Sequence, residues 1–297
     1  MTGTVLVTGG LGRSGRWICD CLADAGWDVV CVDVDHPGFE VDQRPNVDFR
    51  AADLTDRGQA LDLAAELDPD AVVHWAAIPV PLRHPDGQVF ETNVEAAYNT
   101  LTAAGRAGAD VVLASSESYY GFPFSEGQDL PDYLPIDEDH PARPEDPYGL
   151  SKVTSEEIGK AIARKHGVSV AAIRPTWIQY PGEYTALLSQ DDLGPADGNF
   201  WSYVDVRDVA DMVRLALESS LDGFEAFLCV ADENVLGRPT AEVIEEYYGT
   251  LPEKCDLDGE ACAFTNEKAK AVLGWHPRHT WRDAKDEHVP DPDLYGA

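Results

Sequence analysis

Short apolar runs alternate with longer amphipathic stretches along most of the chain. The apolar runs are rich in Val, Ala and Leu, which is typical of strands buried on both faces of a sheet. Because alternating strands and helices join through right-handed crossovers, the pattern predicts an α/β fold with a doubly wound parallel sheet. The predicted strands are residues 4–7, 28–33, 47–50, 70–77, 110–116, 168–173 and 224–230, and the predicted helices are residues 16–23, 56–67, 89–107, 147–165, 206–217, 240–248 and 266–273.

A glycine-rich turn, residues 8–15, joins the first strand to the first helix. Gly9 permits the tight turn, Gly12 lets backbone N–H groups approach a diphosphate, and Gly15 lets the helix pack against the strand. The helix N-terminus offers unpaired N–H groups and the positive end of its dipole to phosphates. The turn therefore predicts a dinucleotide site that includes Gly9, Gly12, Arg13, Ser14 and Gly15.

The second predicted strand ends in Asp33, 18 residues after Gly15. This is close to the spacing at which an acidic residue binds the ribose of NAD. A carboxylate there accepts hydrogen bonds from both ribose hydroxyls and repels a 2′-phosphate, so NAD is the expected cofactor. Arg13 and Arg16 lie near the turn, and NADP therefore stays open as an alternative.

The composition changes after residue 173. Residues 174–200 are rich in Pro, Gly and Asp and are predicted to form a loop, residues 201–204 look extended, and the polar tail from Asp283 is expected to pack loosely. We therefore divide the chain into a Rossmann-type NAD(P)-binding domain at residues 1–175, which also takes in about 204–230, and a small C-terminal substrate-binding lobe at residues 176–203 and 231–297.

Charge and composition exclude several classes of protein. The 297 residues carry a net charge of −32, which disfavours nucleic-acid binding through a basic surface. The sequence has no apolar run long enough to span a membrane and no apolar leader, so we expect a cytoplasmic protein. Its six cysteines include no Cys-x-x-Cys pair and are interpreted as small buried side chains, without a metal site.

Tyr148 and Lys152 lie four residues apart at the start of the helix predicted at 147–165, so they share one face of it. A lysine beside a tyrosine favours the phenolate, which makes a weak base usable near neutral pH. Ser115 and Ser116 end the fifth predicted strand, where a hydroxyl can hold an oxygen that is being oxidised. We predict that Tyr148 takes a hydroxyl proton, Ser116 holds that oxygen, and Lys152 tunes the tyrosine and binds the nicotinamide ribose.

Together with the glycine turn and the reactive residues, further motifs occur along the chain. They are Thr8-Gly9-Gly10-Leu11-Gly12-Arg13-Ser14-Gly15, Asp33, Asp53-Leu54, His74-Trp75-Ala76-Ala77, Asn93-Val94, Ser115-Ser116, Tyr120-Gly121, Tyr148-x-x-x-Lys152, Arg174-Pro175, Tyr203-Val204-Asp205-Val206 and Leu273-Gly274-Trp275. With these motifs the chain resembles the extended short-chain dehydrogenases/reductases, of the NAD-dependent epimerase/dehydratase kind, over nearly its full length. The resemblance implies cofactor contacts from Asp53, Leu54, Ala76, Ala77 and Ser115, a bracing role for Asn93, and a homodimer formed through the helices at 89–107 and 147–165.

Two departures from the family pattern bear on the substrate. Family dehydratases carry Thr-Asp-Glu before their Tyr-Gly, whereas this chain has Ser116-Glu117-Ser118 and lacks the second acid, which disfavours dehydration. Nucleotide-sugar epimerases have a longer stretch with basic residues for the diphosphate before their Tyr-Val-Asp-Val element. Here Pro181–Ser202 contains no Lys or Arg, and a diphosphate would meet the negative charges of Glu183, Asp191, Asp192 and Asp197.

The leading hypothesis is an NAD(P)-dependent oxidoreductase that oxidises a small sugar, a free aldose or uronate, at C1 to a lactone. In the uronate enzymes that this chain resembles, an arginine after the sixth strand grips the carboxylate, and Arg174 matches that position. The alternatives are a nucleotide-sugar 4-epimerase with the same triad and a catalytically silent NAD-binding sensor. The candidate substrate contacts are Ser116, Glu117, Arg174, Thr176 and Trp177, with Tyr203 in addition.

The acidic residues are dispersed, and the chain has 33 Asp but only seven Lys. This distribution resembles the proteins of salt-in halophiles, and an ordinary acidic protein is the alternative. We predict that the free energy of unfolding rises between about 0.1 M and 2 M KCl, because salt screens the repulsion between carboxylates. Thermal denaturation across this range of KCl concentration measures the change in stability. A melting temperature that stays constant or falls contradicts the halophilic interpretation.

Overall fold

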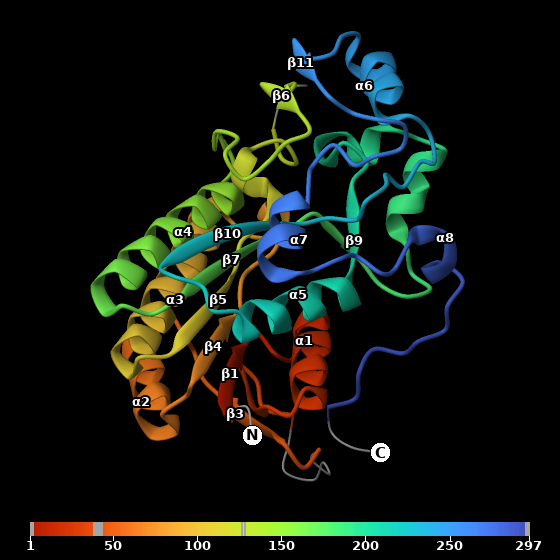
Figure 1. Ribbon diagram of the computed structural model, residues 1–297. Coiled ribbons are helices and arrows are strands. Elements are labelled where there is room, and N and C mark those ends of the chain that lie inside the picture. Colours follow the sequence, from red (N-terminus) through yellow and green to blue (C-terminus); the bar gives the residue numbers. More distant parts are fainter. Residues whose placement is uncertain (1–2, 38–43, 126, 128, 295–297) are drawn as a thin grey trace.

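The computed structural model describes residues 3–37, 44–125, 127 and 129–294. Its centre is a seven-stranded parallel sheet in the order β10-β7-β5-β4-β1-β2-β3 (Figure 1). The strands are β1 (Thr4–Thr8), β2 (Asp28–Asp33), β3 (Val47–Ala51), β4 (Ala71–His74), β5 (Asp110–Ala114), β7 (Val170–Pro175) and β10 (Phe224–Cys229). The chain runs from β1 to one edge through β2 and β3, then returns to β4 and continues to the other edge. The predicted doubly wound α/β fold is confirmed.

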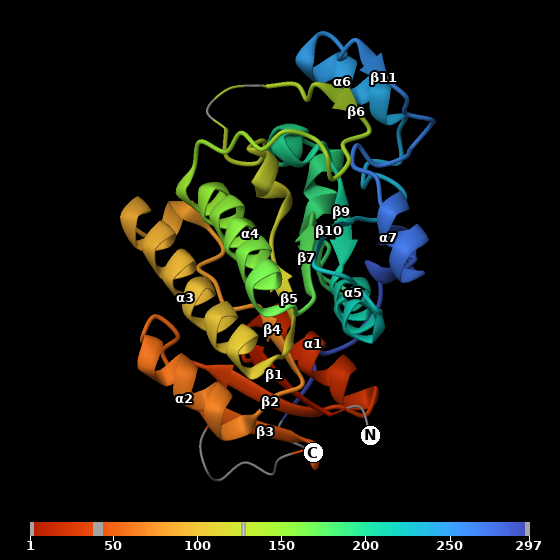
Figure 2. The same cartoon turned by 60° about the vertical axis from the view of Figure 1, so that its left-hand side comes forward.

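Helices cover both faces of the sheet. Figure 2 shows α1 and α5 on one side and α2, α3 and α4 on the other. The helices are α1 (Arg13–Asp24), α2 (Arg57–Leu67), α3 (Asp86–Ala107), α4 (Pro147–His166), α5 (Val206–Glu218), α6 (Thr240–Tyr248), α7 (Glu267–Leu273) and α8 (Trp281–Ala284), and the 3₁₀ helices are η1 (Pro81–Arg83), η2 (Glu117–Tyr120), η3 (Thr185–Gln190) and η4 (Gly194–Asn199). None of the helices in the described part of the chain is long and apolar enough to cross a membrane.

Local sequence explains where the main elements begin and how they pack. Asp146 and Asp205 precede α4 and α5, and each carboxylate accepts hydrogen bonds from backbone N–H groups of the first turn. In β1, Val5 and Val7 face the core under α1 and α5, whereas Leu6 faces the core under α2, α3 and α4. Because both faces of the sheet are buried, its strands are apolar throughout rather than alternating with polar residues.

A third apolar core lies beyond the carboxyl ends of the strands. It includes Tyr120, Tyr184, Phe200, Trp201, Tyr203 and Phe264. Residues 174–200, predicted to form a loop, contain η3, η4 and β8 (Trp177–Gln179), which pairs in parallel with β9 (Tyr203–Asp205). Two further short strands, β6 (Tyr133–Leu134) and β11 (Lys254–Cys255), also pair in parallel. The loop prediction is wrong. Phe200 and Trp201 are buried, with φ angles of 48° and 55°, and their burial orders a segment whose sequence shows no periodic pattern of apolar residues.

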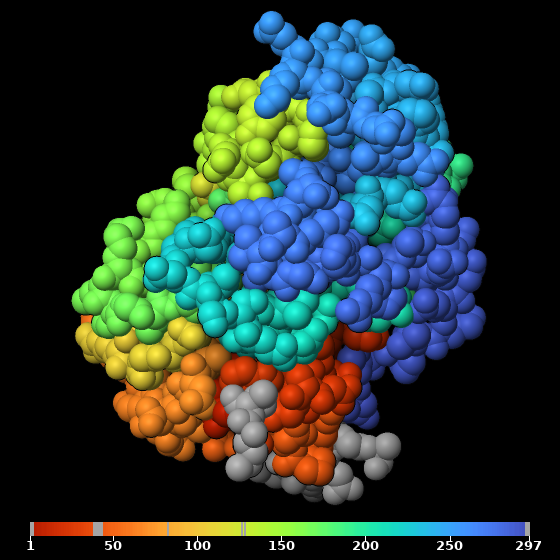
Figure 3. All heavy atoms as spheres, viewed as in Figure 1, coloured from red at the N-terminus to blue at the C-terminus, as the bar shows by residue number. Residues whose placement is uncertain are grey.

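The C-terminal segment is packed against the sheet half of the molecule, which corrects the expectation of a loose tail from residue 283. Leu294 is fully buried in the core under α1 and α5. Asp291 accepts hydrogen bonds from Trp17 Nε1 at 3.2 Å and from Arg13 Nε at 3.0 Å. Helix α7, assigned by sequence to the small lobe, packs on α5 and β10. Figure 3 shows the segment that contains α7 lying on the surface beside α5.

We expect Leu294→Ala to lower the free energy of unfolding by about 2–4 kcal/mol, because it leaves a cavity in a closed core. Val289→Ala is the matched control in the same segment. Val289 is 41% exposed, and its truncation is expected to change stability by less than about 0.5 kcal/mol. Urea denaturation of both variants measures the difference, and equal effects would contradict a packed tail.

Candidate active site

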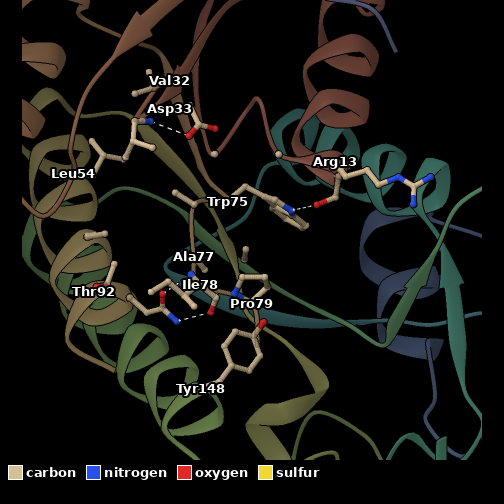
Figure 4. A pocket seen from close by; sticks show the side chains of 18 of the residues that line it. Arg13, Val32, Asp33, Leu54, Trp75, Ala77, Ile78, Pro79, Thr92 and Tyr148 are labelled. Atoms are coloured by element: carbon tan, nitrogen blue, oxygen red, sulfur yellow. Dashed lines mark hydrogen bonds between the residues drawn. The ribbon is translucent and has the colours of Figure 1, made fainter. Parts of the chain in front are cut away.

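A cavity of about 590 Å³ opens at the carboxyl ends of β1 and β4, where the order of the strands reverses. Open α/β sheets bind ligands at such a switch point, and the volume is that of a small-molecule or cofactor site. Figure 4 shows Asp33 and Leu54 toward one end of the cavity and Tyr148 toward the other, with Arg13 and Trp75 between these ends.

Most of the residues predicted to bind a cofactor line this cavity. They are Gly9, Gly12, Arg13, Ser14, Asp33, Asp53, Leu54, Ala76, Ala77, Asn93, Ser115, Tyr148 and Lys152. The sequence did not reveal the apolar part of the lining, which includes Val32, Trp75, Ile78, Pro79, Ile178 and Tyr180. In the sequence these apolar side chains look the same as those of the core, so no signal distinguishes them.

The glycine turn is pressed against the chain that follows β4. A Cβ atom on Gly9 would lie 2.7 Å from the Cα of Ala76, and one on Gly15 would lie 2.1 Å from the carbonyl oxygen of Gly9. Neither position has space for a side chain. Gly12 lines the cavity and immediately precedes α1, so the backbone N–H groups of this helix end are available to a diphosphate. The residues present therefore fit a dinucleotide.

Asp33 is held rigidly at the cavity wall. Its Oδ2 accepts a hydrogen bond from the Leu11 N–H at 3.1 Å, and its Oδ1 accepts one from the Val34 N–H at 2.8 Å. These two bonds fix the carboxylate at the end of β2, where it can accept hydrogen bonds from ribose hydroxyls.

Arg13 connects the glycine turn to two later parts of the chain. Its Nε lies 3.0 Å from the carboxylate of Asp291, and its Nη2 lies 2.9 Å from that of Glu183. The guanidinium also stacks on the ring of Tyr180, at 3.8 Å from the ring centre. Since Tyr180 lines the cavity, Arg13 stands at its rim with two carboxylates around its charge.

The predicted reactive side chains meet at the other end of the cavity. The carboxylate of Asp146 caps α4, which places Tyr148 in the first turn and Lys152 one turn later. The Lys152 ammonium lies 5.3 Å from the centre of the Tyr148 ring and donates a hydrogen bond to the Ala114 carbonyl at 2.8 Å. Ser116, just beyond β5, lies close enough to Tyr148 to influence its pKa, and its Oγ is within 3.2 Å of the Ser118 hydroxyl. The structure thus brings Ser116, Tyr148 and Lys152 together.

Burial dominates the acid–base properties of this group. It raises the pKa of Tyr148 to about 12; the nearby hydroxyl of Ser116 opposes the rise, and two nearby carboxylates add to it. Burial also lowers the pKa of Lys152 to about 8, against the influence of the Glu156 carboxylate. The Lys152 ammonium is hydrogen-bonded to the Ala114 carbonyl at the end of β5, and its expected lowering of the tyrosine pKa stays a prediction.

A buried ion pair lies directly behind the reactive group. Glu156, on α4, accepts a hydrogen bond from Ser115 Oγ at 2.6 Å and from Arg174 Nε and Nη2 at 2.8 and 2.7 Å. Arg174 Nη1 also donates to the Tyr120 hydroxyl at 2.8 Å. The sequence analysis missed Glu156, although one signal was available: it follows Lys152 by four residues and so shares its helix face.

Several residues that were predicted to contact the substrate form hydrogen bonds within the protein instead. Arg174 is buried and bonded to protein groups, which corrects the expectation that it grips a substrate. The buried hydroxyl of Thr176 lies 3.4 Å from a carbonyl oxygen of β10, and neither Thr176 nor Trp177 is among the described residues that line the cavity. The Tyr203 hydroxyl accepts a hydrogen bond from the Trp281 N–H at 2.8 Å.

Glu117 lies next to Ser116 as a buried acid. Its side chain is 4% exposed, and its Oε1 accepts a hydrogen bond from Asn199 Nδ2 at 2.5 Å. The other carboxyl oxygen is buried and has no hydrogen-bond partner among the described residues. Burial raises the pKa of Glu117 well above its usual range. Glu117 is also not among the described residues that line the cavity, so its contact with the substrate stays a prediction.

The fold and the site define an NAD-dependent enzyme of the extended short-chain dehydrogenase/reductase class. The sequence profile of the NAD dependent epimerase/dehydratase family matches residues 5–190. The chain belongs to this family, whose enzymes depend on NAD, and we propose that NAD binds in the cavity beside the glycine turn and Asp33.

Known relatives include both epimerases and a dehydrogenase. The UDP-glucose 4-epimerase of Lactobacillus helveticus is 26% identical over an alignment of 315 positions that covers 93% of this chain and 92% of that protein. The L-arabinose 1-dehydrogenase (NAD(P)(+)) of Haloferax volcanii is 30% identical over 194 residues, 63% of this chain and 72% of that protein. A crystal structure of a UDP-galactose 4-epimerase is 28% identical, with a TM-score of 0.67 and coverage of 95% of this chain and 97% of that one. The choice between the two reactions therefore depends on this chain's own residues.

We expect Gly15→Ala to abolish NAD binding and to lower stability, because the new Cβ would lie 2.1 Å from the Gly9 carbonyl oxygen. Gly87→Ala, in α3, is the matched control, since a Cβ there meets nothing within 4 Å and the helix gains up to about 1 kcal/mol. Calorimetric titration with NAD and thermal unfolding test both variants. A Gly15→Ala protein that binds NAD as the wild type does would show that the turn is not so tightly packed.

Proposed function

We propose that this protein oxidises the anomeric hydroxyl of a free sugar, most simply a neutral aldose, to the corresponding lactone. Family membership and the NAD site support an oxidoreductase step at a sugar hydroxyl. The nicotinamide of NAD, when bound, supplies the hydride acceptor. The anomeric hydroxyl loses its proton and C1 loses a hydride, and the product is therefore a lactone.

The charge of the chain after β8 carries this proposal. Pro181–Ser202 contains four carboxylates and no Lys or Arg. In the rest of the small lobe, Arg282 forms ion pairs with Glu233 and Glu260, and on the neighbouring helix α5 Arg207 pairs with Asp205 and Glu287. A nucleotide-sugar diphosphate is normally held by cations whose charge is not already compensated. The arrangement therefore supports a substrate without phosphate groups.

The same reasoning favours a neutral aldose over a uronate. Arg174, the residue expected to bind a uronate carboxylate, is 3% exposed and paired with Glu156. Glu117 is a buried acid next to Ser116, and a second carboxylate in that space would raise the cost of holding either charge. A neutral sugar has hydroxyl groups that can donate to the unpartnered oxygen of Glu117.

The reactive side chains have distinct parts in the proposed oxidation. Ser116 donates a hydrogen bond to the anomeric oxygen and holds it beside Tyr148. Tyr148, as the phenolate, accepts the proton of that hydroxyl while the C1 hydride leaves, and the electrons of the O–H bond form the carbonyl. The Lys152 ammonium, 5.3 Å from the centre of the tyrosine ring, supplies the positive charge that stabilises the phenolate.

Nucleotide-sugar 4-epimerisation is the second candidate function. It is favoured by the match to UDP-glucose 4-epimerase of Lactobacillus helveticus over 93% of this chain. It uses the same three side chains, with the hydride returned to the opposite face of the sugar. The acidic character of residues 181–202 weighs against it.

The proposal extends to the organisation of the molecule. Residues 176–203 and 231–297 would bound the sugar, and two copies of the chain would pair through α3 and α4. Tyr98 on α3 and Leu150 on α4 are 48% and 46% exposed, and such exposed apolar side chains on adjacent helices support that pairing.

One assay separates the candidate functions. The protein is incubated with NAD or NADP and a panel of free aldoses, uronates, UDP-glucose and UDP-galactose, while the absorbance of the reduced cofactor is followed. We expect net reduction with a neutral aldose. Interconversion of the UDP-hexoses without net reduction would establish the epimerase instead, and cofactor binding with neither activity would indicate an NAD sensor.

Tyr148→Phe tests the assigned base. It is expected to lower kcat by at least about a hundredfold while sparing NAD binding, because only the proton acceptor is lost. Tyr98→Phe removes a hydroxyl from an exposed position, 48% accessible, and serves as the control with unchanged turnover. Retained activity in Tyr148→Phe would show that another group takes the proton.

A further inference from the structure

We propose that Glu156 is a positioning residue for the reaction, whose buried carboxylate fixes the end of β5 and the surroundings of Lys152. No role was assigned to this residue from the sequence. The inference rests on the proposed oxidoreductase function only through the group formed by Ser116, Tyr148 and Lys152. It does not depend on which sugar is the substrate.

The end of β5 is bonded to α4 at two successive residues. The Ala114 carbonyl accepts from Lys152 Nζ at 2.8 Å, and Ser115 Oγ donates to Glu156 Oε1 at 2.6 Å. The next residue, Ser116, lies close enough to Tyr148 to influence its pKa. Ser115 stands between the two residues that contact the reactive pair, so the Glu156 contact holds the backbone of both neighbours in place.

Glu156 is itself fixed by a third element of the fold. Arg174, at the end of β7, donates to both of its carboxyl oxygens through two guanidinium nitrogens, at 2.8 and 2.7 Å. The side chains of Glu156 and Arg174 are 0% and 3% exposed. Two parallel hydrogen bonds of this kind leave a carboxylate little rotational freedom. The carboxylate therefore ties α4 and β5 to the rigid strand β7.

The charges around Lys152 give the same carboxylate an electrostatic role. On α4 itself the ammonium lies 5.3 Å from the centre of the Tyr148 ring, and Glu156 follows one turn later; on β4, His74 is neutral because burial lowers its pKa to about 3. Arg174, on β7, is paired with Glu156. Burial lowers the pKa of Lys152 to about 8, and the Glu156 carboxylate limits that fall. Without it the pKa falls further, and Tyr148 loses its neighbouring cation at neutral pH.

The titration of Lys152 can be measured without any substrate. The chain has seven lysines, so labelling lysine Cε with ¹³C gives few resonances, and Lys152→Arg identifies the one that matters. We expect a midpoint near 8 in the wild type, and a fall of about one pH unit or more in Glu156→Gln. Glu157→Gln is the matched control, because that neighbouring side chain is 62% exposed, and its midpoint should equal that of the wild type.

A merely structural Glu156 would lower the melting temperature without moving this midpoint, so a folded Glu156→Gln protein with an unchanged Lys152 titration overturns the proposal. If Glu156→Gln does not fold, the double variant Glu156→Gln, Arg174→Met removes both buried charges. Its Lys152 titration midpoint is then compared with that of the wild type in the same way. In the sugar assay, the alkaline limb of kcat/KM is expected to move to lower pH in parallel. A wild-type protein without turnover would refute the proposed reaction and leave the lysine titration as an independent result.

Discussion

The close approach of two backbone segments determines where this protein can bind a cofactor. The Gly9 carbonyl leaves no space for a Cβ on Gly15, and the same turn lies against Ala76 beyond β4. This contact brings the start of α1 to the carboxyl ends of β1 and β4, where the order of the strands reverses. The other features of the site are arranged around the cavity at this point: Asp33 toward one end, the tyrosine and lysine of α4 toward the other.

The parts of the fold that follow from local physical chemistry could be predicted from the sequence. Strands buried on both faces are apolar throughout, and the strand at Asp28–Asp33 has the predicted bounds. Helices that begin at an aspartate cap, such as α4 at Pro147, were also recognisable. Glycines and strand-end polar residues then predicted residues that line one cavity, because the topology of a doubly wound sheet brings these positions to one edge.

What the sequence could not specify is the partner of each charged side chain. Arg174 occupies the position expected of a substrate-binding residue, but Glu156 is near enough to pair with it inside the protein. Lys152 was expected to act on the tyrosine oxygen, but the Ala114 carbonyl is its bonded partner. The buried Leu294 likewise has no periodic signal around it. Such contacts join residues far apart in the chain, and local patterns do not record them.

The ion pair behind the site also has an energetic consequence for its neighbours. Burying Glu156 and Arg174 costs desolvation, and such a pair often contributes little net stability compared with apolar side chains of similar volume. The pair instead fixes the orientation of the Glu156 carboxylate. Held by two hydrogen bonds, this carboxylate has little freedom to move and can accept a third bond, from Ser115. An apolar replacement could fill the space, but it could neither hold that hydroxyl nor offset the desolvation of the nearby Lys152 ammonium.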